Sequence, residues 1–129
     1  MSAQSKVEGF LINLDFTYEQ IDEGSWVIND EEKGLEQVAI ISTDSLVVIR
    51  VNVMKVPEAT REEFFRKLLE LNAADLIHGA YAIESGDVLL VDTLEAETMD
   101  IEELQASLDA IGLALAQHYP ILSEYRETE

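Results

Sequence analysis

Apolar positions recur along the chain with two different periods, and the changes between these periods divide it into helices and strands. Residues 5–14 carry apolar side chains three and four positions apart, which predicts a short amphipathic helix. Residues 16–21 alternate, and they fit either an extension of that helix or a short strand. A second helical period begins at Phe64, and a stripe from Ile101 to Tyr119 predicts a long last helix.

Between the helices, runs of β-branched residues predict strands. Residues 25–30 form one brief run, and residues 38–42 and 46–56 flank the short polar segment "TDS", which indicates an antiparallel hairpin. Residues 78–84 and 88–97 flank "SGD", a tight-turn sequence that predicts a second hairpin. In the strand at 46–56, one buried face is expected to hold Val47, Ile49, Val51 and Val53.

Polar residues and prolines predict where the helices begin and end. Glu63 lies three positions after Thr60, and Glu103 three positions after Asp100, so both segments fit a capping box. Pro120 is expected to stop or kink the last helix, because proline cannot donate the hydrogen bond that a helix interior requires.

The order of these elements predicts the fold class. Three helices and about five strands in the order α-β-β-β-α-β-β-α indicate an α+β fold with an antiparallel sheet. The 129 residues are enough to bury one core, so we expect a single domain over residues 1–129 with a polar tail from about residue 123.

The net charge is the most unusual total of the sequence. The chain has 27 acidic against 8 basic residues, a net charge of −19, which disfavours direct contact with nucleic acid or anionic lipid. The acidity serves either solubility or a protein partner that is basic or prone to aggregation. The chain has no cysteine, no signal-peptide pattern and no apolar run long enough to span a bilayer, so we expect a cytoplasmic protein.

Residues capable of chemistry are few and scattered. His78 and His118 lie 40 positions apart and match no metal-ligand spacing, and the acidic clusters do not match a calcium loop. No catalytic or phosphate-binding motif occurs, so we expect no enzyme, metal or cofactor. His78 falls at the joint between a helix and a strand, where a ring fills space and bonds a carbonyl.

Surplus apolar surface is the more informative feature. The segment "VLLV" at 88–91 is apolar on both strand faces, which indicates either a central strand or one covered by a partner. The first helix carries Phe10 and Ile12 in addition to its main stripe. Such surface is typical of protein interfaces, although one monomer's core could also absorb it.

Residues 46–122 resemble a known family. The matching features are "LLELN" at 68–72, the small-residue strand "HGAYAI" at 78–83, a one-turn hairpin with a second apolar strand, and a "D-x-E-E-L" helix that ends in "YP". This order resembles the YbjN-like family, which is labelled as bacterial sensory transduction regulators and is similar in fold to type III secretion chaperones, including the Tir chaperone group. The acidic segment "DTLEAETMD" at 92–100 departs from that pattern.

The resemblance implies a chaperone-like fold, dimers, no catalytic residues, and an extended client segment held on the surface. The candidates for self-association lie on the second helix and the strand after it, and those for the client lie on the first helix: Phe65, Leu69, Leu76 and Tyr81 for the dimer, and Phe10 and Leu11 for the client.

Three hypotheses follow. The first is a non-enzymatic, dimeric adaptor or regulator of the YbjN-like type that binds a protein client through apolar surface. The second is a dedicated type III secretion chaperone for one effector. The third is a small-ligand sensor or enzyme that uses a cleft between the sheet and the helices, supported by the carboxylates and His78.

Overall fold

The computed structural model describes residues 3–126 and has the predicted α+β class, with three helices and an antiparallel sheet. Its elements are α1 (Ala3–Asn13), β1 (Tyr18–Asp22), β2 (Ser25–Asp30), a short 3₁₀ helix η1 (Glu31–Lys33), β3 (Leu35–Ser42), β4 (Leu46–Lys55), α2 (Arg61–Ala74), β5 (Ala80–Glu84), β6 (Asp87–Glu95) and α3 (Ile101–Ser123). The sheet has six strands rather than about five, because the ambiguous segment after the first helix forms β1.

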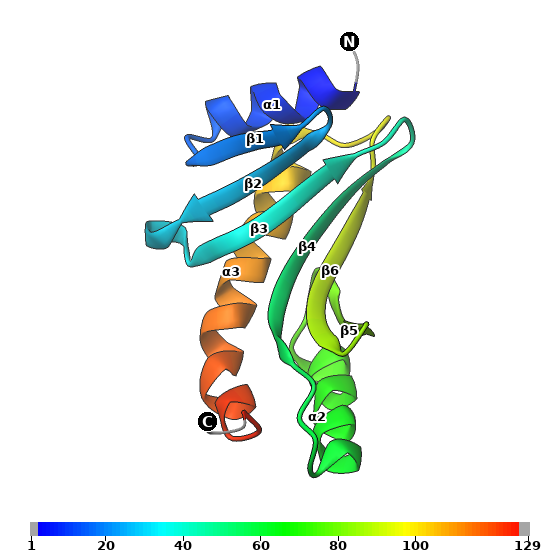
Figure 1. Cartoon of the computed structure of the whole chain (residues 1–129). Coiled ribbons are helices and arrows are strands. Elements are labelled where there is room, and N and C mark those ends of the chain that lie inside the picture. The colour runs from blue at the N-terminus through cyan, green and yellow to red at the C-terminus, as the bar shows by residue number, and fades with distance from the viewer. Residues whose placement is uncertain (1–2, 127–129) are drawn as a thin grey trace.

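The strands lie in the order β1-β2-β3-β4-β6-β5, and every neighbouring pair is antiparallel. In Figure 1, β2 and β3 pass in front of α3, and α2 lies at the β5 end of the sheet. The apolar segment "VLLV" belongs to β6, which has a neighbouring strand on each side. The first of the two readings of that segment is therefore confirmed.

One core fills the space between the sheet and the helices. Val7 and Leu11 of α1 are fully buried, and Trp26 of β2 belongs to the same cluster. The indole N–H of Trp26 donates to the Glu8 carboxylate at 3.3 Å, which satisfies its polar edge. From α3, the predicted stripe contributes Leu104, Leu108 and Ile111.

The alternation along β4 holds only as far as Asn52. Val47, Ile49 and Val51 are buried as predicted, but Val53 is only partly buried and Met54 is buried in its place. The pairing register with β6 shifts between Asn52 and Met54. A bulge of this kind inserts one residue and reverses which face the later side chains occupy.

One of the two predicted capping boxes forms. The Asp100 carboxylate accepts from the Glu103 N–H at 2.8 Å, and the Glu103 carboxylate accepts from the Asp100 N–H at 3.2 Å. The box at Thr60 was wrong. Thr60 has a left-handed backbone (φ 55°, ψ 35°) instead of the extended conformation of a cap, and its hydroxyl donates to the Ala59 carbonyl.

The last helix runs through Pro120 to Ser123, so the predicted stop at Pro120 did not occur. Packing beyond the proline accounts for this: Leu122 is buried, and the ring of Tyr125 meets the ring of Phe64 edge-on with centroids 5.2 Å apart. The start of the expected polar tail therefore packs against α2.

A close backbone approach joins the start of β3 to the middle of α3. A Cβ added to Gly112 would lie 2.5 Å from the Lys33 carbonyl oxygen, so only glycine fits at this crossing. Gly34 (φ 73°) then turns the chain into β3. This contact fixes one end of the space between α3 and the sheet.

Candidate protein-binding surfaces

The face of the sheet that points away from α1 and α3 carries partly exposed apolar side chains. Residues directly opposite each other on paired strands share a face, and Val27 lies opposite Ala39, Ile41 opposite Val48, and Arg50 opposite both Ala39 and Val91. We call this surface the open face and define it by its apolar residues, which are only partly buried and lie outside the core cluster: Val27, Ala39, Ile41, Val48 and Val91.

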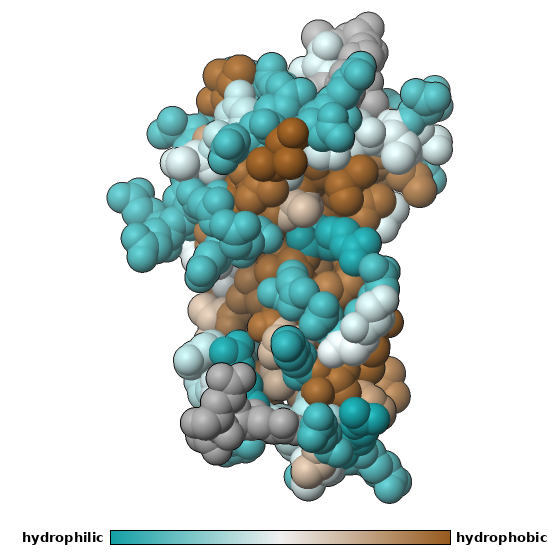
Figure 2. Space-filling model, viewed as in Figure 1, coloured by the Kyte–Doolittle hydropathy of each residue, from teal (hydrophilic) through white to brown (hydrophobic). Residues whose placement is uncertain are grey.

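Figure 2 shows apolar side chains gathered in the middle of the molecule, over the strands, with hydrophilic side chains around them. Two charged residues lie directly opposite the defining residues, Glu19 opposite Val27 and Arg50 opposite Ala39 and Val91, and the Arg50 guanidinium lies 3.1 Å from the Glu84 carboxylate. Both side chains are substantially exposed, so this pair contributes little to stability. The open face is therefore an apolar patch with a polar border.

A second apolar surface lies between α2 and the edge strand β5. This α2–β5 groove has a volume of about 290 Å³ and is lined by Phe65, Leu68, Leu69, Asn72, Tyr81, Ala82 and Ile83. Three of the four residues predicted for self-association therefore meet in one groove. The fourth, Leu76, is partly buried against the core and does not line it.

The four dimer candidates differ in how much they offer a partner. Leu69 is 68% exposed and Phe65 is partly buried, whereas Tyr81 is 6% exposed and belongs to the wall of the groove. Asn72 fixes that wall, since its side chain accepts from the Tyr81 N–H at 2.7 Å and donates to the Tyr81 carbonyl at 3.3 Å. These bonds occupy the outer edge of β5 at that position, where an added strand would otherwise pair.

The client candidates on α1 also divide. Phe10 is partly buried and packs against the core, and Leu11 is fully buried inside it. Ile12 is the apolar side chain that α1 leaves exposed. The interface roles of Phe10 and Leu11 stay predictions, and Leu11 reaches a client only if α1 moves.

Positive and negative charges are balanced on the helix that forms one side of the α2–β5 groove. Helix α2 is electroneutral, although the whole chain has a net charge of −19, so the rest of the chain carries all of the excess negative charge. The charged residues of α2 are Arg61, Arg66, Lys67, Glu62, Glu63 and Glu70. The side of the α2–β5 groove that α2 forms therefore adds no net charge to the repulsion between two acidic proteins.

A buried polar chain ties α2, β5 and α3 together beneath the groove. His118 of α3 is 1% exposed, with its Nδ1 2.6 Å from the Tyr81 hydroxyl oxygen and its Nε2 3.2 Å from a carboxylate oxygen of Asp75. Asp75 is the residue at which α2 ends. Burial, and secondarily the negative charge of Asp75, raise the pKa of Tyr81 far above its usual range, so the phenol keeps its proton.

Sequence reasoning missed the place of His118. The stripe on α3 was predicted to end in Tyr119, but the Tyr119 side chain is exposed and His118 is buried instead. The steps from Ile111 to Leu115, His118 and Leu122 are four, three and four, which is the helical period. The spacing therefore places His118 among the buried positions of α3, although the predicted stripe of apolar residues did not include it.

His78 lies between α2 and β5, as expected from the sequence, and its Nδ1 is 4.0 Å from a carboxylate oxygen of Asp92. That same oxygen accepts from the buried Ser107 hydroxyl at 2.6 Å. Gly79 follows with φ 83°, and a Cβ there would lie 2.9 Å from the Val91 carbonyl oxygen. The small residue after His78 thus allows a close approach to β6.

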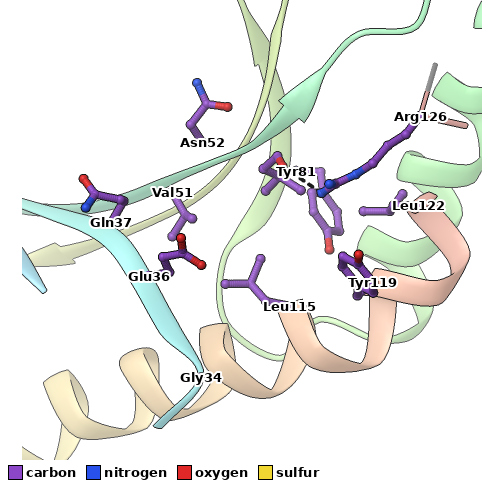
Figure 3. A pocket seen from close by; sticks show the side chains of 11 residues that line it. Gly34, Glu36, Gln37, Val51, Asn52, Tyr81, Leu115, Tyr119, Leu122 and Arg126 are labelled. Carbon is purple, nitrogen blue, oxygen red and sulfur yellow. Dashed lines mark hydrogen bonds between the residues drawn. The ribbon is translucent and has the colours of Figure 1, made fainter. Parts of the chain in front are cut away.

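A cleft does exist between the sheet and α3, with a volume of about 380 Å³. Figure 3 shows Leu115 and Tyr119 of α3 facing Val51 and Glu36 across it. Arg126 closes one end, where it donates to the Val53 carbonyl at 3.3 Å and lies over the Tyr119 ring at 5.3 Å. His78 does not line this cleft, so the pairing of cleft and His78 in the third hypothesis was wrong.

Comparison with known proteins identifies the fold. The family model CesT_Tir_1 matches residues 1–128. Among solved structures, the type III secretion chaperone SycH of Yersinia pestis, in complex with a fragment of YscM2, aligns with a TM-score of 0.64 at 14% identity over 90% of this chain and 98% of that one. YbjN of E. coli aligns with a TM-score of 0.65 at 10% identity over 90% of both chains.

An uncharacterized protein from Methanothermobacter thermautotrophicus is also similar, with a TM-score of 0.68 at 17% identity over 96% of this chain and 99% of that one. These matches confirm the resemblance to YbjN and to the secretion chaperones at the level of the fold. No curated protein matches the sequence. Among residues 3–126, no helix is long and apolar enough to cross a membrane.

Proposed function

The chain belongs to the CesT_Tir_1 family, and from this premise we propose that it is a non-enzymatic adaptor that forms a homodimer and binds a protein client. The observation that carries the proposal is the open face: Val27, Ala39, Ile41, Val48 and Val91 lie together on a sheet face that α1 and α3 leave uncovered. Contiguous apolar surface with a polar border is typical of protein interaction sites.

The client is expected to be basic around its apolar contacts. A chain of net charge −19 attracts a cationic segment over distances comparable to the Debye length and repels acidic competitors. The apolar contacts then supply affinity, since their burial releases about 25 cal/mol per Å² before the entropic costs of association. The absence of cysteine from the sequence fits action in the reducing cytoplasm.

The occupant of the α2–β5 groove is a second copy of this chain. Two copies that each carry −19 repel one another, and the charges of α2 cancel, so this side of the groove adds no net charge to the repulsion. The groove also offers exposed apolar side chains on both of its sides, Leu69 on α2 and Ile83 on β5. Three of the residues predicted for self-association, Phe65, Leu69 and Tyr81, are therefore proposed as parts of one dimer site.

A more specific form of this proposal is a dedicated type III secretion chaperone. It is supported by the fold of SycH, whose structure holds a fragment of YscM2, and by the ExoU–SpcU complex of the Pseudomonas aeruginosa type III secretion system. In that case a single client would occupy the open face. A general adaptor would capture several clients with similar basic and apolar segments.

Capture experiments with matched variants test the adaptor function. Tagged protein is used to capture partners from the host lysate, with the wild type compared with Ile41→Glu on the open face and Leu113→Glu on the exposed side of α3. We expect one stoichiometric partner with the wild type and with Leu113→Glu, and its loss with Ile41→Glu. Equal capture by all three would exclude the open face as the client site.

The cleft beside α3 supports a second candidate function, the recognition of a small zwitterion. Glu36 and Arg126 carry opposite charges on its lining, and Val51, Leu115 and Leu122 supply an apolar floor. Free amino acids with apolar side chains are the natural probes, with calorimetry on the wild type and on Arg126→Gln. Absence of binding at millimolar concentration would remove this candidate and leave the adaptor function unaffected.

A further inference from the structure

The hydrogen bonds between Asp75 and His118 and between His118 and Tyr81 connect three elements at one joint, where His118 is buried. Asp75 ends α2, Tyr81 lies on β5, and His118 belongs to α3. The two contacts, 2.6 Å to the Tyr81 hydroxyl and 3.2 Å to the Asp75 carboxylate, use both nitrogens of one ring. The Tyr81 side chain also lines the α2–β5 groove, so the state of the ring and the wall of the groove are mechanically connected.

The position of the proton on His118 follows from its two partners. In the neutral ring, the Asp75 carboxylate can only accept from Nε2, so Nδ1 carries no proton and accepts from the Tyr81 hydroxyl. The single ring proton is on Nε2, and this N–H donates a hydrogen bond to the Asp75 carboxylate. When the imidazole is neutral, both of its nitrogens and the Tyr81 hydroxyl proton have a hydrogen-bond partner.

We propose that His118 is a pH-sensitive joint, and that its protonation loosens α2 and β5 from α3 and so weakens binding at the α2–β5 groove. A second proton on the ring would occupy Nδ1 and remove the acceptor of the Tyr81 hydroxyl. That hydroxyl would then need a new partner inside the core, and an unsatisfied buried donor is costly. The effect on the groove rests on the proposed homodimer, whereas the effect on the joint does not.

Two titratable groups contact the ring, and they act in opposite directions. Asp75, from the end of α2, favours the imidazolium, but its side chain is 45% exposed, so water screens the attraction. Tyr81, from β5, opposes protonation through a shorter and buried contact. The shorter, buried contact is the one that a second ring proton would break.

The sign of the pH dependence follows from linkage. If a second ring proton breaks the contact with the Tyr81 hydroxyl, as proposed, stability falls as the pH is lowered. The unfolding constant should then rise by up to about tenfold per pH unit below roughly pH 6.5. Acid also relieves repulsion among the carboxylates, so variants are compared with the wild type at each pH.

The chain has two histidines, which gives the experiment a matched control. Urea unfolding is measured at pH 7.5 and 5.5 for the wild type, His118→Gln and His78→Gln. We expect His78→Gln to keep the full acid response of the wild type, and His118→Gln to lose it. An acid response that is the same in all three proteins, or lost in His78→Gln alone, would overturn the proposal.

Two further variants keep the test decisive if His118→Gln does not fold. Tyr81→Phe removes the hydroxyl that blocks Nδ1, so its acid response should shrink. Asp75→Asn removes the charge that favours the imidazolium, so its acid response should grow. A merely structural role for the two partners would lower stability equally at both pH values, and that result would also overturn the proposal.

The dimer is measured separately by sedimentation at the same two pH values. We expect the dissociation constant of the wild type to rise on acidification and that of Tyr81→Phe to rise less. If the wild type is monomeric at pH 7.5, the proposed homodimer fails, and the unfolding data still decide whether His118 is the joint. If the dimer is present but indifferent to pH, the link from the joint to the groove is wrong.

Discussion

The two ends of this molecule use apolar surface in different ways. At the α2 end, the α2–β5 groove is bordered by an electroneutral helix, and its wall is fixed by Asn72 and by the buried chain through His118. On the open face, Val27, Ile41 and Val48 lie on strands that each have a neighbouring strand on both sides, in a chain whose net charge is −19.

This difference suggests a division of labour. A surface that must fit a copy of itself cannot carry excess charge of one sign, because the same charge would face it across the interface. A surface that receives a different chain gains from excess charge, since a basic client is then attracted and other acidic proteins are excluded. The cancelling charges of α2 therefore favour the proposed role of the groove in self-association, and the net charge of −19 of the whole chain favours a basic client.

The largest expected loss of stability comes from a substitution in the core beneath α2. Phe64 is fully buried and meets Tyr125 from beyond the end of α3, so Phe64→Ala should cost about 3–5 kcal/mol. Urea unfolding measures this cost. Phe65→Ala is the control, since Phe65 is partly exposed and should cost much less. Equal costs would mean that α2 is not anchored through Phe64.

A substitution on the surface can test the groove and the open face independently, because it leaves the protein folded. Leu69→Asp places a charge on an exposed groove residue, so we expect the dimer to dissociate while the free energy of unfolding of the monomer changes by about 0.5 kcal/mol or less. Sedimentation and urea unfolding check both parts. Leu113→Asp, on the exposed side of α3, is the control and should stay dimeric. Client capture should survive in both variants if the open face is independent.

Tyr81→Asp should behave differently from Leu69→Asp, although both residues were selected from the sequence as exchangeable interface candidates. Tyr81 is buried and bonded to His118, so its replacement would bury a carboxylate and leave the ring without its partner. We expect loss of the folded state at neutral pH, detected by circular dichroism. A folded, monomeric Tyr81→Asp protein would mean that Tyr81 is not needed for the joint.

Local patterns predicted the elements well, whereas tertiary contacts decided the exceptions. Alternation predicted the buried side of β4 up to Val51, but the bulge after Asn52 depends on the partner strand β6 and leaves no mark in the period. The spacing of acidic residues predicted the cap at Asp100. The same spacing failed at Thr60, where the chain arrives with a left-handed backbone.

The surfaces were predictable only in part. Selecting residues from α2 and the following strand found three members of the groove, because sequence neighbours joined by a short connection tend to pack together. The open face could not be defined, since it requires knowing which strands are adjacent. The joint at His118 was missed because its partners, Tyr81 and Asp75, lie 37 and 43 positions away.

The two caps give a smaller effect at the ends of the two helices. Asp100→Ala should cost about 1 kcal/mol, because it removes the acceptor of the Glu103 N–H at the start of α3. Thr60→Ala should change stability by less than about 0.5 kcal/mol, since its hydroxyl caps no helical N–H. Urea unfolding of both variants measures the two changes in the free energy of unfolding. A comparable cost at Thr60 would mean that α2 depends on a cap that the structure does not show.

Salt gives the mildest and most direct comparison of the two surfaces, because it changes no residue. Added salt screens the repulsion between two chains of net charge −19, so the dimer should tighten severalfold between 50 and 500 mM sodium chloride. The same salt screens the attraction of a basic client, so client binding should weaken. Opposite salt dependences at the two surfaces would follow from the division of labour. If both interactions weakened with salt, the groove would have to join unlike charges, and the neutrality of α2 would not explain the dimer.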